Sequence, residues 1–282
     1  MSLTPLPGVM IEPLVAAALA EDLGRAGDVT SDSVIPVGTP ARFAMAARDA
    51  GVMAGMDLAA LAFELIDPSV EFSAHCHDGD RVAPGDVVAH VSGPARSLLT
   101  AERVALNFLG HLSGVATATA TIADAIAHTQ ANVCCTRKTT PGLRAVEKYA
   151  VRAGGGANHR FGLDDAILIK DNHIAVAGSL TEAVTRAQAH AGHLMPIEVE
   201  VDSLDQLREL LVNPVTAVLI DNFSPEMAAE AVSLVDGAMV VEASGRVTAA
   251  TAPALAQAGV DVVSAGWITH SATILDIGLD DA

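Results

Sequence analysis

The basic residues of this chain are concentrated in one short window. All three lysines, Lys138, Lys148 and Lys170, lie between residues 137 and 170, together with four arginines. The whole chain of 282 residues has 16 Lys and Arg against 34 Asp and Glu, a formal net charge of −18, so this window is a local exception. Such a window is either a helix face paired with acidic neighbours or an anion-binding site, and the fold decides between the two.

Candidate side chains of opposite charge form two sets. The cationic half consists of Arg137, Lys138, His159, Arg160 and Lys170. It suits an anion with more than one carboxylate or phosphate, because arginine binds a carboxylate through two parallel hydrogen bonds. The acidic half consists of Glu200 and Asp221, which suit sugar hydroxyls, a substrate that carries Mg²⁺, or a developing cation.

Two pairs of small residues add a third kind of site. At Ser244-Gly245 and Ala265-Gly266 the backbone N–H groups can approach a phosphate closely, because no bulky side chain is in the way. Together, the three sets predict an enzyme that joins a polyanionic acid to a phosphorylated sugar.

These residues need a fold that brings them together. From about residue 130, short β-branched runs alternate with amphipathic stretches; the runs are 133–138, 166–173, 197–203, 217–223, 239–245 and 260–266. The helical stretches are 180–191, 203–211, 224–235 and 248–258, and Ser203 and Ser224 stand where helix N-caps belong. Strands and helices that alternate at this spacing form parallel sheets. Six units predict a small or open α/β barrel, with a doubly wound sheet as the alternative that periodicity does not exclude.

The amino-terminal part predicts a different architecture. Strand candidates at 41–49, 70–77 and 86–92 and helix candidates at 11–23 and 56–66 predict an α+β, sandwich-like domain over 1–112. A long helical stretch follows from 97 to about 128, and we expect Ser113-Gly114 to interrupt it. The barrel is then expected over 113–269, and the tail 270–282 is expected to pack back on the first domain.

Polar residues follow every predicted barrel strand. The strand ends are Thr136-Arg137-Lys138, the run 170–173, Glu198 with Glu200, Asp221-Asn222, the run 242–245 and the run 264–266. Parallel α/β folds bind ligands where the carboxyl ends of their strands meet. Six polar ends in succession therefore favour an active site over a set of solubilising residues.

Long, ordered motifs resemble those of the quinolinate phosphoribosyltransferases, the decarboxylating nicotinate-nucleotide pyrophosphorylases. They are EDL (21–23), GDVT (27–30), AERVALN (101–107), CTRKTTPGLR (135–144), GGGANHR (154–160), IKDNH (169–173), EVEV (198–201) and IDN (220–222). The resemblance covers nearly the whole chain. It implies transfer of phosphoribosyl from phosphoribosyl pyrophosphate to quinolinate with loss of CO₂, which gives nicotinate mononucleotide and pyrophosphate in NAD biosynthesis.

The resemblance also implies roles for individual residues. Catalysis would rest on Lys138, Lys170, Glu200 and Asp221. Substrate binding would involve these four together with Arg103, Thr136, Arg137, His159, Arg160, Ser244, Gly245, Arg246, Ala265, Gly266 and Trp267. The cationic half would hold the quinolinate carboxylates, and the stretches 244–246 and 265–267 would take the 5′-phosphate. Mg²⁺ would arrive with phosphoribosyl pyrophosphate near Glu200 and Asp221, with no metal held by the protein alone.

Two positions depart from the family pattern. Arg246 stands where the family usually has another glycine, and Trp267, the only tryptophan, stands where a small residue is usual.

The alternative functions are a related phosphoribosyltransferase for another acid, a Schiff-base lyase that uses Lys170, and a non-catalytic scaffold.

Partners and location follow from charge and composition together with the resemblance. The acidic balance argues against nucleic acid and anionic membrane as partners, and no apolar run is long enough to span a membrane. The three cysteines have no CxxC spacing and predict reduced thiols in a cytoplasmic protein. The resemblance implies a homodimer in which Arg103 reaches across into the site of the partner.

Overall fold

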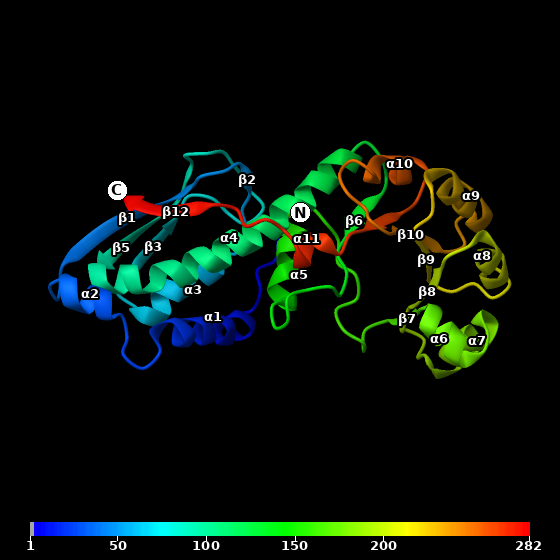
Figure 1. Cartoon of the computed structure of the whole chain (residues 1–282), viewed down its shortest axis with the longest axis horizontal. Helices are drawn as coiled ribbons and strands as arrows, with labels where there is room; N and C mark the ends of the chain where they lie inside the picture. Colours follow the sequence, from blue (N-terminus) through cyan, green and yellow to red (C-terminus); the bar gives the residue numbers. More distant parts are fainter. Residues whose placement is uncertain (1–2) are drawn as a thin grey trace. The chain divides into compact units, whose positions relative to one another are not determined.

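The computed structural model describes residues 3–282, which divide into two compact units (Figure 1). Unit 1 contains the described residues up to Ala120, together with Thr140–Gly155 and Ser271–Ala282, and unit 2 contains Thr121–Thr139 and Gly156–His270. The segment Thr140–Gly155 therefore groups with unit 1 although unit 2 flanks it in the sequence. Among the described residues, no helix has the length and apolar character that crossing a membrane requires.

Unit 1 combines antiparallel strands with helices. Its larger sheet has the order β12 (Ile277–Asp281), β1 (Pro40–Ala47), β5 (Val87–Pro94) and β3 (Glu71–Ala74). A short antiparallel ribbon is formed by β2 (Gly51–Val52) and β4 (Arg81–Val82). The helices are α1 (Gly8–Leu23), α2 (Val29–Val34), α3 (Met56–Ile66), α4 (Ala95–Ile126) and α5 (Arg144–Ala153), and α4 continues past Ala120 into residues of unit 2. The predicted α+β character of the amino-terminal part is confirmed.

Helix α4 runs without a break, so the predicted interruption at Ser113-Gly114 is wrong. The Ser113 Oγ accepts a hydrogen bond from the backbone N–H of Ala54 at 3.0 Å and lies 3.2 Å from the carbonyl oxygen of the same residue. A Cβ at Gly114 would collide with the carbonyl of Thr273. These two residues thus allow close packing of other backbone segments on the helix. One glycine costs a helix only about 1 kcal/mol, which such packing offsets.

Unit 2 is built on six parallel strands (Figure 1). They are β6 (Asn132–Cys134), β7 (Ile167–Ile169), β8 (Ile197–Val201), β9 (Ala217–Asp221), β10 (Val240–Ser244) and β11 (Val262–Ser264). The spatial order is β6-β11-β10-β9-β8-β7, so the chain winds in one direction from β7 to β11, and β6 and β7 form the two ends of the sheet. This winding is that of an open α/β barrel, as predicted, and not that of a doubly wound sheet.

The helices of unit 2 are α6 (Asp171–Ala177), α7 (Leu180–His190), α8 (Leu204–Leu210), α9 (Pro225–Val235), α10 (Ala252–Gln257) and α11 (Trp267–His270). Helices α8, α9 and α10 lie along the outer side of the strands (Figure 1). Two of them begin at predicted caps: the Oγ of Ser203 accepts the N–H of Gln206 at 3.3 Å, and the Oγ of Ser224 accepts the N–H of Met227 at 3.2 Å. Along β8, Val199 and Val201 are buried while Glu198 and Glu200 alternate with them on the opposite face.

All six strands are shorter than the predicted runs, and the difference is important at β6 and β7. The run 133–138 is a strand only as far as Cys134, and the run 166–173 only as far as Ile169. Residues 171–173 are instead the first turn of α6, because the Lys170 carbonyl accepts the N–H groups of His173 at 2.8 Å and Ile174 at 3.0 Å. Lys170 is therefore the last extended residue before the helix, which places it at the carboxyl end of β7.

Candidate active site

A cavity of about 390 Å³ lies within unit 2 at the carboxyl ends of the strands. Both charged halves of the predicted site reach it. The lining residues are Thr136, Arg137, Lys138, His159, Arg160, Leu168, Lys170, Glu200, Leu219, Asp221, Glu242, Ser244 and Ser264. Residues that are up to 128 positions apart in the sequence thus meet in one cavity, because parallel strands bring their carboxyl ends to one rim.

A second cavity of about 370 Å³ adjoins the first and shares five of its lining residues, Lys138 and Asp221 among them. It is lined by the remaining members of the predicted site in unit 2: Gly245, Arg246, Ala265, Gly266 and Trp267. Arg103 is the one predicted residue outside both linings. It lies on α4 in unit 1 with 64% of its side chain exposed, and its guanidinium is 3.7 Å from the carboxylate of Glu102.

Backbone hydrogen bonds fix the loop that carries Arg137 and Lys138. The Oγ1 of Thr136 accepts the N–H of Lys138 at 3.0 Å, and the hydroxyl of buried Thr269 donates to the Lys138 carbonyl at 2.7 Å. A Cβ at Gly266 would lie 2.8 Å from the Lys138 side chain, so only a glycine fits there without a shift. Thr136 and Thr269 therefore position the lysine, and Gly266 leaves room for it.

Arg160 is anchored at one end and has an unused donor at the other. Its Nη1 donates to the Ala166 carbonyl at 2.9 Å, whereas its buried Nε has no hydrogen-bond partner among the described residues. Burial and the neighbouring Arg137 lower the pKa of Arg160. A buried donor without a partner costs free energy.

Carboxylates pair with these cations. The Lys170 ammonium is in contact with the Glu200 carboxylate, and 44% of the lysine side chain is exposed. A Schiff-base lysine is usually desolvated and activated as a neutral amine, so this pairing does not favour the lyase alternative. At the end of β9, Asp221 accepts a hydrogen bond from the Asn222 amide at 2.6 Å. Glu200 and Asp221 thus place carboxylate oxygens at one side of the cavity.

The loops around the second cavity are tightly built. Gly245 has a φ of +108°, and a Cβ there would collide with the side chain of Asn222. Arg246 also has a left-handed conformation, with a φ of +50°, which costs a non-glycine residue roughly 1–2 kcal/mol. The indole N–H of Trp267 donates to the carbonyl of Val247 at 2.8 Å and so links the loop after β11 to the loop after β10.

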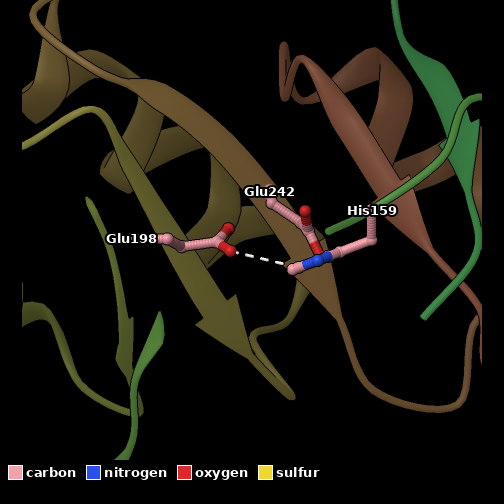
Figure 2. A group of neighbouring side chains, drawn as sticks. All are labelled: His159, Glu198 and Glu242. Carbon is pink, nitrogen blue, oxygen red and sulfur yellow. Dashed lines mark ion pairs between the residues drawn. The ribbon is translucent and has the colours of Figure 1, made fainter. Parts of the chain in front are cut away.

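A buried cluster of three side chains lies beside the cationic half (Figure 2). The Nε2 of His159 is 3.1 Å from a carboxylate oxygen of Glu198 on β8 and 3.8 Å from one of Glu242 on β10. The sequence analysis placed both glutamates at strand ends but gave them no role. The signal that could have identified Glu242 is its charge, because it lies inside a strand between two buried apolar residues, Val241 and Ala243.

The carboxyl group of Glu242 ionises with difficulty. Its side chain is 8% exposed, and burial together with the negative charge of Glu198 raises its pKa to about 7. Near neutral pH a large fraction of this carboxyl group is therefore protonated.

This shift predicts how a Glu242→Gln variant responds to pH. Between the ordinary pKa of 4.5 and about 7, the folded wild type keeps a proton that the unfolded chain releases, so its free energy of unfolding falls as pH rises. Glutamine stays uncharged and removes this loss. We expect the melting temperature of the variant, relative to the wild type, to rise across this interval and then level off. Thermal unfolding at several pH values measures it.

The matched control for this measurement is Glu230→Gln, which alters a half-exposed glutamate on α9. Its melting temperature should keep a constant difference from the wild type over the same interval. A Glu242→Gln curve parallel to that of the wild type would contradict the assignment.

Comparisons with known proteins agree with this geometry. Residues 28–113 match the model of the quinolinate phosphoribosyl transferase N-terminal domain, and residues 115–280 match that of the C-terminal domain. The chain is 42% identical to a probable nicotinate-nucleotide pyrophosphorylase [carboxylating] of Bacillus subtilis, over 96% of this chain and 93% of that protein. Identity to the nicotinate-nucleotide pyrophosphorylase [carboxylating] of Mycobacterium leprae is also 42%, over 94% and 95%.

A solved structure shows the same fold. The crystal structure of NadC from Streptococcus pyogenes superimposes with a TM-score of 0.95 at 42% identity and covers 98% of each chain. Since the two domain models match in chain order, and relatives of this identity align over almost the full length, the chain belongs to the quinolinate phosphoribosyltransferase family.

Proposed function

We propose that this chain transfers the phosphoribosyl group of phosphoribosyl pyrophosphate to quinolinate with loss of CO₂. The products are nicotinate mononucleotide and pyrophosphate, an entry into NAD biosynthesis. The observation that carries the proposal is the pair of adjoining cavities, one lined by cations and carboxylates and the other by small residues at two strand ends. Family membership supports the same reaction.

The first cavity suits a dicarboxylate. Arg137, Arg160 and Lys170 line it together with Lys138, so several cations are available for two carboxylate groups. The Arg160 guanidinium would donate to one of them. A monocarboxylate such as nicotinate would leave part of this set without an anion, which favours quinolinate as the acceptor substrate.

The acidic half suits the ribose and the metal that accompanies the pyrophosphate. Glu200 and Asp221 offer carboxylate oxygens, the ligands that Mg²⁺ prefers, and both line the first cavity. Mg²⁺ bound to phosphoribosyl pyrophosphate would neutralise the leaving group. Lys138 lines both cavities, so its ammonium would lie near the negative charge of both substrates.

The reaction needs orientation more than a strong base. The pyridine nitrogen attacks ribose C1 while the bond from C1 to pyrophosphate breaks, and the positive charge that develops on the ribose is offset by Glu200 and Asp221. The quaternary ring nitrogen then takes up electron density as the C2 carboxylate leaves as CO₂, and C2 gains a proton. The cationic half holds the acid in the position that both steps require.

The second cavity suits the 5′-phosphate. Residues 245–246 and 265–267 line it, and backbone N–H groups of the glycines would approach the phosphate closely, with Arg246 as the charged member of the loop after β10. A glycine at this position would let the backbone approach the phosphate closely. Arg246 would instead attract the phosphate by its positive charge.

The remaining proposals concern assembly and location. We propose a homodimer in which the exposed Arg103 of one subunit completes the site of the other. The three cysteines form no disulfide bond with one another, which fits the reducing cytoplasm that we propose as its location.

The direct test is an assay with quinolinate, phosphoribosyl pyrophosphate and Mg²⁺ that follows CO₂ and nicotinate mononucleotide. We expect both products in equal amounts, with little turnover when nicotinate replaces quinolinate. Preferred turnover of nicotinate, or a product formed without CO₂, would overturn the substrate assignment.

Arg246→Ala is expected to raise the KM for phosphoribosyl pyrophosphate about tenfold or more and to leave the KM for quinolinate nearly unchanged. The reason is that a charge-assisted hydrogen bond to phosphate contributes about 1.5–3 kcal/mol. Steady-state kinetics with each substrate varied in turn measures both constants. Arg208→Ala, an exposed arginine on α8, serves as the control, and equal effects on both constants would contradict the role.

Site sharing is tested with two inactive variants. Arg103→Ala and Lys170→Ala should each lose most activity when pure. After they are mixed and allowed to exchange subunits, hybrid dimers should regain one intact site, about a quarter of wild-type activity at full statistical exchange. No recovery, with exchange verified by mass spectrometry, would place Arg103 outside the site of the partner.

A further inference from the structure

The open side of the barrel is partly covered by the segment 157–160. Ala157 forms a bridge with Cys134 of β6: its N–H donates to the Val133 carbonyl at 2.8 Å, and its carbonyl accepts the N–H of Cys135 at 3.3 Å. The segment therefore extends the sheet at the end formed by β6, where β11 is the only other strand paired with β6 among the described residues. It carries His159 and Arg160, both of which line the first cavity.

His159 extends from this segment to strands further along the sheet (Figure 2). Its Nε2 lies 3.1 Å from Glu198 on β8, the strand next to the opposite end, and 3.8 Å from Glu242 on β10. The three side chains are 11%, 13% and 8% exposed. The cluster thus connects the open side of the barrel to its interior.

The hydrogen bonds assign the protonation state of the ring. The Nδ1 of His159 accepts the backbone N–H of Arg160 at 2.7 Å, so Nδ1 carries no proton. A neutral imidazole then has its proton on Nε2, which donates to Glu198. A metal ion on Nε2 would have to displace that proton and leave an imidazolate, so this geometry does not favour a metal site although the three ligand atoms lie within 4.8 Å of one another.

The carboxyl group of Glu242 determines the net charge of the cluster. A neutral ring between two ionised carboxylates would leave a net charge of −2 in a buried place, which is costly. A proton on Glu242 halves it, in agreement with the raised pKa and with an Oε1 that is buried without a hydrogen-bond partner among the described residues. The groups that face Glu242 are Glu198, His159 and Cys135, with Ser264 from β11.

We propose that Glu198 is a positioning residue that holds His159 as the neutral Nε2–H tautomer, and that His159 thereby fixes Arg160 for one carboxylate of the acid substrate. Arg160 is then held at two points, its N–H by the Nδ1 of His159 and its Nη1 by the Ala166 carbonyl. Arg160 itself lines the first cavity, where the acid substrate would bind. This inference rests on the proposed function for the identity of the acid, and on the geometry alone for the tautomer.

The first experiment measures the tautomer in the full chain without substrates. Nitrogen-15 NMR of histidine-labelled protein at about pH 7.5, with His159→Gln to assign the signal, should show Nε2 protonated and Nδ1 unprotonated. A ring protonated on Nδ1, or on both nitrogens, would overturn the inference whatever the activity of the protein. Absence of quinolinate turnover would instead overturn the proposed function and leave this result standing.

The second experiment separates positioning from general damage. Glu198→Ala should raise the KM for quinolinate about tenfold or more, with the KM for phosphoribosyl pyrophosphate within about twofold of wild type, and should abolish the single tautomer. Glu198→Gln keeps a carbonyl that accepts the Nε2 proton, so it should restore most of both. If Glu198→Ala does not fold, Glu198→Gln and the tautomer measurement on the wild type still test the role of Glu198.

A control variant tests whether the effect is specific to Glu198. Glu230→Ala, at a half-exposed glutamate on α9, should leave both constants and the His159 signal unchanged. Equal increases in the two KM values for Glu198→Ala, or an unchanged tautomer in that variant, would show that Glu198 has no specific link to Arg160.

Discussion

The parallel register of β8, β9 and β10 is the constraint on which the site depends. Glu200 pairs with Leu219, and Leu219 pairs with Glu242, so these three side chains lie at one level on the inner face. Asp221 pairs with Ser244 one layer nearer the carboxyl ends. Since side chains alternate with a period of two, a slip of one residue would turn these groups toward the helices and place valines in the cavity. Packing of the apolar face against the helices therefore also sets the positions of the acids.

Charge balance explains how an acidic protein maintains a cationic cavity. Cations gathered in one cavity repel one another unless carboxylates accompany them, and the inner faces of the strands supply these carboxylates: Glu200 pairs with Lys170, and Glu198 lies near Arg160. The net charge of −18 opposes binding to large polyanionic surfaces, but a small dicarboxylate meets only the local field. The basic window of the sequence is accordingly divided: Arg137, Lys138, Arg160 and Lys170 line the cavity, while buried Lys148 belongs to α5 in unit 1.

Local sequence patterns were sufficient to predict the strands and most of the residues that line the two cavities. β-branched runs with polar ends predicted all six barrel strands, and serines before apolar periodicity predicted the starts of α8 and α9, because both signals depend on neighbouring residues alone. Ser113-Gly114 misled because their role is in packing against residues 54 and 273, which are distant in sequence. The cluster of His159, Glu198 and Glu242 was missed for the same reason. Its members meet only through the register and the open side of the barrel, and no local spacing encodes that meeting.

The two departures from the family pattern are linked in space. Gly245 must be glycine, because a Cβ would collide with Asn222, so the loop after β10 turns in a left-handed conformation before it reaches Arg246. Arg246 continues that conformation at a cost that a glycine would not have. The indole N–H of Trp267 binds the carbonyl of Val247, the next residue, and no small aliphatic side chain could donate this bond. Trp267 therefore helps to hold the loop in which Arg246 adopts a strained backbone, so the two residues act on the same loop.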